Sequence, residues 1–89
     1  MSNNEKYQKV FQEIFNVSEN KLNEGFNFKN VDSWDSFAHL ALISELEEAF
    51  EVMFESEDIL HFGGYMNGME ILKRYGVDFD EWNTLIKSY

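Results

Sequence analysis

Apolar residues recur every three or four positions through most of the chain, which is the spacing of helices with one buried face. The first such stretch covers residues 4–16. Its apolar side chains fall on one side and are Tyr7, Val10, Phe11, Ile14 and Phe15. Asn3 or Asn4 is the expected N-cap, because a short polar side chain can accept a hydrogen bond from the first turn. The pattern therefore predicts an amphipathic helix near the start of the chain.

A second helix is expected from Ser36 to about Val52, with Asp35 or Ser33 as its cap. On a wheel of about 100° per residue, the buried face is centred on Leu46. That face also holds His39, Leu42, Ile43, Ala49, Phe50 and Met53. The opposite side and its flanks hold Phe37, Leu40, Ala41, Ser44, Glu47, Glu48 and Glu51.

Phe37 and Leu40 are two apolar residues that this buried face does not need. They neighbour Ser36 and are surrounded by carboxylates, and an exposed apolar spot with a charged rim is typical of a docking surface. The alternative is that the preceding loop, through Trp34, covers Phe37. The pattern leaves both interpretations open.

The rest of the chain predicts shorter helices. One starts after Ser56 as N-cap and carries Ile59, Leu60 and Phe62. Another covers residues 65–75 and stops at Gly76. Its apolar side presents Tyr65, Met69, Leu72 and Tyr75. A last segment, capped by Asp80, has Trp82, Leu85, Ile86 and Tyr89 on one face.

Residues 17–35 form a long connection between the first two helices. A loop of this length inside a small domain is unusual unless side chains of its own hold it in place. This one contains five apolar residues that can act as anchors: Leu22, Phe26, Phe28, Val31 and Trp34. We expect an ordered loop that packs across the helices.

These elements predict an all-α fold, a small four-helix bundle in one domain. The chain has 89 residues without proline, and no alternating apolar and polar run indicates a strand. With 44% hydrophobic residues, nine of them Phe, it can fill one core. We assign residues 1–76 to the bundle and residues 77–89 to a C-terminal extension that is helical and packed on it.

The charge distribution favours protein partners with basic surfaces. The net charge is −10, and no Lys or Arg occurs between Lys29 and Lys73. Nucleic acid and anionic membrane are disfavoured because both attract basic surfaces. The alternative is a merely solubilising acidic face. The chain lacks Cys, and its polar N-terminal stretch argues against a signal peptide. No apolar run is long enough to span a bilayer. We therefore expect a cytoplasmic monomer.

Asp35, Ser36 and Phe37, followed by an apolar helix that ends Leu46-Glu47-Glu48-Ala49-Phe50, resemble the acyl carrier protein family. The resemblance covers roughly residues 5–76 and includes the long first loop and the short third helix. It implies that Ser36 receives 4′-phosphopantetheine from coenzyme A, and that the arm holds acyl groups as thioesters. Asp35 resembles the family's aspartate for recognition by the phosphopantetheinyl transferase. The fold expected is thus a bundle of acyl-carrier type with a C-terminal extension.

The same resemblance assigns partner contacts to the outward face of the second helix. These positions are Phe37, Leu40, Ala41, Ser44, Glu47, Glu48 and Glu51. The implied partners are the transferase and acyl-loading or acyl-processing enzymes with basic docking patches. Several features differ from the usual pattern and suggest a specialised pathway: Phe37 in place of leucine, a less acidic helix middle, Trp34 and His39.

Other functions were weighed against the carrier. Ser36 and His39 are three residues apart, so they could form a nucleophile and base, but no strand–turn–helix elbow or oxyanion loop accompanies them. We therefore expect a non-catalytic protein. We expect no metal site, because His39 and His61 lie far apart and no acidic cluster has calcium-loop spacing. The main alternative is an acidic helical adaptor or inhibitor without a prosthetic group.

The interior residues indicate which acyl groups such a carrier could hold. Phe50, Phe54 and Phe62 are expected to point inward, and closely packed rings leave little space. A carrier with this core is predicted to hold a short or polar acyl group, or one that stays outside the bundle.

Overall fold

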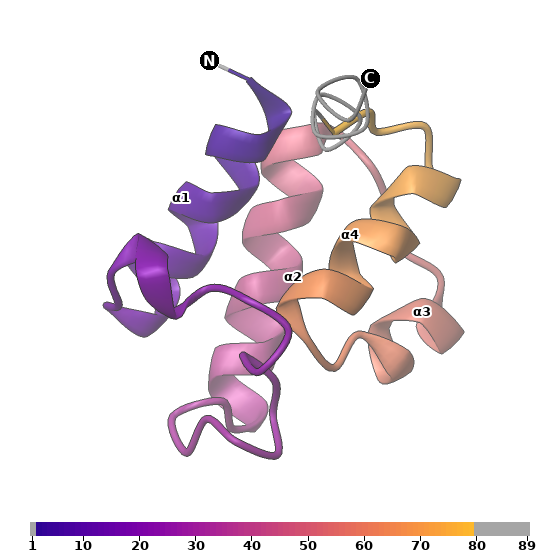
Figure 1. Cartoon of the computed structure of the whole chain (residues 1–89). Coiled ribbons are helices and arrows are strands. Elements are labelled where there is room, and N and C mark those ends of the chain that lie inside the picture. The colour runs from indigo at the N-terminus through magenta and orange to yellow at the C-terminus, as the bar shows by residue number, and fades with distance from the viewer. Residues whose placement is uncertain (1, 80–89) are drawn as a thin grey trace.

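The helices form where the amphipathic patterns predict them along the chain. The computed structural model describes residues 2–79, which form four α-helices and no strand (Figure 1). The helices are α1 (Asn3–Phe15), α2 (Ser36–Phe50), α3 (Ser56–His61) and α4 (Tyr65–Arg74). A 3₁₀ turn, η1 (Glu19–Lys21), lies in the first loop. In Figure 1, α1 packs antiparallel along α2, and α4 and α3 lie on the other side of α2. The predicted all-α architecture is confirmed.

The start of α1 differs from the expected one. Ser2, and not Asn3 or Asn4, is the N-cap: its hydroxyl accepts from the Glu5 N–H, and the Glu5 carboxylate accepts from the Ser2 N–H. This reciprocal capping box satisfies two donors that lack helical partners. Helix α1 then ends at Phe15, because Asn16 adopts a left-handed conformation with φ of 54°.

Helix α2 begins as predicted and ends earlier. The Asp35 carboxylate caps it by accepting from the Ala38 N–H at 2.9 Å. The helix stops at Phe50, because Glu51 turns left-handed with φ of 54°. The expectation that Met53 is buried was wrong: the helical wheel no longer applies there, and the Met53 side chain is 83% exposed. Phe54 is buried in its place.

Helix α3 also departs from the prediction. Glu55 occupies the cap position, so Ser56 is the first helical residue and not the cap. Of its predicted apolar residues, Leu60 is 79% exposed, whereas Phe62 is buried and Ile59 half-buried. A six-residue helix offers the bundle only one narrow side, so Leu60 cannot be buried together with its neighbours.

The long loop is ordered, as expected, by Phe26 and Trp34, which are both buried. Its backbone also pairs with the chain before α4: the Tyr65 N–H donates to Phe26 O at 2.9 Å. Phe28 does not anchor it, contrary to expectation, and its side chain is 56% exposed. Pairing of the Phe28 N–H with Gly63 O holds the Phe28 backbone at the surface.

Aromatic rings fill the core around Phe11. Its ring lies 4.9 to 6.5 Å, between centroids, from six others: Tyr7, Phe15, Phe26, Trp34, Phe62 and Tyr65. The fully buried Tyr7 hydroxyl donates to the carbonyl of Tyr65 at 2.5 Å and so joins α1 to α4. The loop, α1, α4 and Phe62, which follows α3, thus contribute rings to one core.

Gly76 ends the fourth helix as predicted, with φ of 91°. The core continues beyond it, because Val77 and Phe79 are buried and Asn3 Nδ2 donates to Asp78 O at 2.8 Å. The predicted last segment, with its cap Asp80 and the face of Trp82, Leu85, Ile86 and Tyr89, lies outside the described residues.

Candidate functional site

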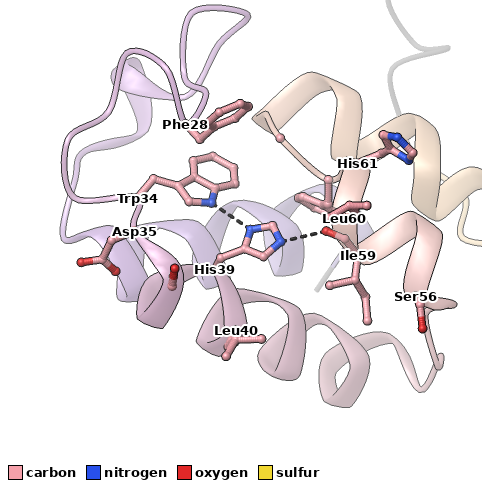
Figure 2. A pocket seen from close by; sticks show the side chains of 12 residues that line it. Phe28, Trp34, Asp35, His39, Leu40, Ser56, Ile59, Leu60 and His61 are labelled. Carbon is pink, nitrogen blue, oxygen red and sulfur yellow. Dashed lines mark hydrogen bonds between the residues drawn. The ribbon is translucent and has the colours of Figure 1, made fainter.

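An open groove lies where the loop, the start of α2 and α3 meet (Figure 2). Its volume is about 800 Å³. We call it the α2–α3 groove and define it by six of its lining residues: Phe28, Trp34, Ser36, Leu40, Ile59 and Leu60. Three of these, Phe28, Leu40 and Leu60, expose large apolar side chains to solvent. The groove therefore offers an apolar surface beside the exposed hydroxyl of Ser36.

Ser36 is the first residue of α2 and is exposed. Asp35 is exposed too, and its side chain caps the helix. The amino end of a helix carries the positive end of the helix dipole, which stabilises a nearby negative charge by about 0.3 to 1 kcal/mol. A phosphodiester on the Ser36 oxygen would gain this interaction while remaining in solvent.

The outward face of α2 contains the residues assigned to partner binding. Phe37 is 86% exposed, so the alternative in which Trp34 covers it is wrong. Trp34 packs instead against Phe11, Phe15 and Phe26. The other exposed positions on this face are Leu40, Ala41, Ser44, Glu48 and Glu51.

Glu47 differs from its acidic neighbours. It is half-buried, and its Oε2 accepts from the Phe54 N–H at 2.9 Å. Its carboxylate thereby stabilises the turn after α2, and one of its oxygens is already engaged. The helical wheel placed Glu47 on the flank of the outward face but could not reveal this contact, because Phe54 lies beyond the end of the helix.

His39 connects three elements across the floor of the groove (Figure 2). The Trp34 indole Nε1–H donates to His39 Nδ1 at 3.0 Å, and His39 Nε2 lies 2.8 Å from the carbonyl oxygen of Ile59. An indole N–H can only donate, so Nδ1 is the acceptor and Nε2 carries the proton that is donated to Ile59. We call this pair of bonds the His39 bridge. The sequence placed His39 on the inner face but did not indicate its partners.

The His39 bridge affects whether His39 could act as a base for the Ser36 hydroxyl. Both ring nitrogens are engaged, by Trp34 and by Ile59, so neither is available to accept a proton from Ser36. His61, the second histidine, is exposed, and its Nδ1 lies 2.9 Å from the Glu57 carbonyl of its own helix. Among residues 2–79, no three His, Asp or Glu side chains gather into a group that could hold a metal ion.

A second cluster holds α3 against α4. Asp58 accepts from Arg74 at 2.7 Å and from the Tyr75 hydroxyl at 2.5 Å, and Tyr75 accepts from the Glu55 N–H at 2.9 Å. These bonds hold the pKa of Asp58 below its ordinary value, with the Tyr75 bond the larger cause and the Arg74 bond the next. The same carboxylate raises the pKa of the Tyr75 hydroxyl. No sequence pattern indicated this cluster, since Asp58 lies 16 and 17 residues before Arg74 and Tyr75.

Comparison with known proteins identifies no relative. No protein-family model matches this chain, and neither a curated protein nor a solved structure matches it significantly. Within residues 2–79, none of the helices combines the length and apolar character needed to cross a bilayer. The groove, Ser36 and the surface around them are therefore the features that point to a function.

Proposed function

We propose that this protein is an acyl carrier that holds acyl intermediates as thioesters on a 4′-phosphopantetheine arm attached to Ser36. One observation carries the proposal: Ser36 is an exposed serine at the amino end of α2 that also lines an apolar groove. A tethered phosphate suits the helix dipole, and an acyl group on the arm can reach apolar surface nearby.

The surface around Ser36 supports docking of the enzymes that such a carrier serves. Phe37 and Leu40 are exposed next to the attachment point, with Glu48 and Glu51 further along the same helix. Exposed ion pairs contribute only about 0 to 1 kcal/mol each. Binding to basic patches on a transferase or an acyl-processing enzyme is therefore expected to be weak and brief, as a cytoplasmic, monomeric carrier with several clients requires.

Modification of Ser36 is the direct test. The full chain is incubated with coenzyme A, Mg²⁺ and a phosphopantetheinyl transferase of broad specificity, and its intact mass is measured. We expect the mass to rise by one phosphopantetheine, and peptide mapping to place the group on Ser36.

Two serine variants make the result specific. Ser36→Ala is expected to abolish the mass gain, whereas Ser44→Ala, which removes an exposed serine from the same helix, is expected to leave it unchanged. A failure of several transferases to modify the wild-type protein, or modification that persists in Ser36→Ala, would contradict the proposal.

A second candidate is an acidic adaptor that binds a basic protein partner without a prosthetic group. The exposed Phe37 favours it, because an apolar side chain surrounded by acids fits a protein interface whether or not Ser36 is modified. The modification test separates the two candidates, since an adaptor does not gain mass.

A further inference from the structure

Helix α3 is held in place at several points. Ile59, in its middle, accepts from His39 of α2, and Asp58 binds Arg74 and Tyr75 at the end of α4. After α3, the Asn67 side chain accepts from the N–H groups of Gly63 and Gly64. A movement of α3 alone away from α2 would break its bond to His39 and the bonds of Asp58 to α4. Specific contacts to both neighbouring helices thus hold α3 beside α2, beneath the open groove.

Behind the His39 bridge the interior is already full. Phe62, Leu46 and Leu42 are fully buried there, and the ring of Phe62 faces those of Phe11 and Phe54. Gly68 of α4 approaches Phe62 so closely that even a methyl group on it would overlap the ring. An alkyl chain that entered here would have to displace the buried ring of Phe62, which directly follows α3.

On the solvent side of the bridge the surface is open and apolar. Leu40 and Leu60 are 63% and 79% exposed and line opposite sides of the groove, one from α2 and the other from α3. Both line the same groove as Ser36. A short chain tethered at Ser36 could therefore cover apolar surface without any change in the bundle.

We propose that the His39 bridge keeps cargo out of the bundle, so that an acyl group tethered at Ser36 lies in the open α2–α3 groove against Leu40 and Leu60. The cargo class this selects is a short acyl group, because in an open groove one side of the chain stays in water and a longer chain exposes more apolar surface there. His39 is a positioning residue in this account, acting through α3. The inference rests on the proposed carrier function for its cargo, but it can be tested without a transferase.

The test uses the absence of cysteine from the chain. Ser36→Cys provides one thiol, to which N-alkylmaleimides with butyl, octyl or hexadecyl chains are attached, and nuclear Overhauser contacts locate the chain. With His39 present, we expect contacts to the Leu40 and Leu60 methyl groups and none to Leu46 or Phe54. The hexadecyl protein is expected to melt within about 2 °C of the butyl protein. Contacts to Leu46 or Phe54 with His39 present would overturn the proposal.

Variants at position 39 test the role of the bridge. His39→Leu introduces an apolar side chain of similar size and removes both hydrogen bonds of the bridge. In this variant we expect the hexadecyl chain to contact Leu46 and Phe54. The long chain should then raise the melting temperature by about 4 °C or more over the butyl chain. His39→Gln, whose amide can still donate to Ile59 O, should restore the wild-type contacts.

The matched control is His61→Leu, which removes the other histidine from the same groove but breaks no bond between helices. It should behave as the wild type does.

If His39→Leu leaves the alkyl chain in the groove, or if His61→Leu admits the alkyl chain to the interior equally well, the bridge does not control entry. If His39→Leu does not fold by circular dichroism, His39→Ala replaces it under the same criteria. Because labelling needs no enzyme, failure here is distinct from failure of Ser36 to accept phosphopantetheine.

Discussion

Gly68 shows how one residue sets the closest packing in the core. It is buried in α4, directly against the Phe62 ring and the Tyr7 hydroxyl. The Tyr7 hydroxyl, in this place beside Gly68, donates to Tyr65 O. Burial raises the pKa of that hydroxyl well above the ordinary value. The hydroxyl therefore stays protonated and remains a donor at any ordinary pH. A larger residue at position 68 would disturb two rings and this bond together.

Gly68→Ala tests this packing. In an isolated helix alanine is favoured over glycine by about 1 kcal/mol, but overpacking a core typically costs about 1 to 3 kcal/mol. Because the added methyl would overlap two side chains, we expect a net loss of stability, seen as a melting temperature lower by several degrees. Met66→Ala, at an exposed position of the same helix, should change stability by less than about 0.5 kcal/mol. Unchanged or higher stability of Gly68→Ala would show that the core can adjust.

Helix α3 illustrates an element that depends on its neighbours. Six residues are too few for a helix to be stable in water by itself. Its structure depends on Phe62 in the core, on the His39 bridge and on the bonds of Asp58 to Tyr75 and Arg74. The Asp58 side chain is only 14% exposed, so these bonds are partly shielded from solvent. One wall of the α2–α3 groove is thus held in place by residues of other helices.

The Asp58 cluster predicts a pH dependence. The folded-state pKa of Asp58 lies below its ordinary value of 3.8, so its contribution to stability is complete above about pH 4 and is lost as the pH falls through the lowered pKa. The folded-state pKa of Tyr75 lies above its ordinary value of 10.0, so its contribution is complete below about pH 10 and is lost as the pH rises through the raised pKa.

Asp58→Asn isolates this contribution. We expect it to melt below the wild type at pH 7, and the difference between them to shrink as the pH is lowered below 4, because the wild-type carboxyl then becomes neutral as well. Glu57→Gln removes an equal charge from an exposed site on the same helix and serves as control. A difference that stays constant from neutral to acid pH would mean that the ionised carboxylate is not what holds α3.

At the scale of the whole molecule, charge and one apolar side chain together define how partners would meet this protein. The net charge of −10 attracts basic proteins from a distance, and salt screens that attraction over about 10 Å at 0.1 M. Phe37, exposed at the start of α2, would then supply the short-range apolar contact next to Ser36. In the proposed carrier, both features would act before any chemistry at the serine.

Phe37→Ala should therefore weaken modification of Ser36 without weakening the fold. We expect kcat/KM of the transferase to fall about five- to tenfold, a loss of about 1 to 1.4 kcal/mol that is typical of a contributing interface residue, with an unchanged melting temperature. Raising the salt concentration should lower kcat/KM for wild type and variant alike. Met53→Ala is the control, because it removes another exposed apolar residue, from the turn beyond the far end of α2. Equal effects of the two substitutions would argue against docking through Phe37.

The features that were predicted correctly from the sequence share one property: each depends only on residues close together in the chain. Spacing along one helix explains the helices and their buried faces around Leu46 and Phe11. It also explains the Asp35 cap and the outward position of Phe37. Met53 and Phe28 were misplaced, because the burial of Met53 depends on where α2 stops and that of Phe28 on the backbone pairing with Gly63. A period of 3.6 residues carries no information on either point.

The amino-acid sequence by itself determined that this chain forms an all-α fold with an acidic outer surface and a serine at the start of its second helix, because helix periodicity, capping and charge are local properties. Only the tertiary structure decided that Ser36 opens onto an apolar groove, that His39 joins Trp34 to Ile59, and that Asp58 binds Tyr75 and Arg74. Those contacts join residues of different elements. They depend on the relative positions of packed helices, which no single stretch of sequence specifies.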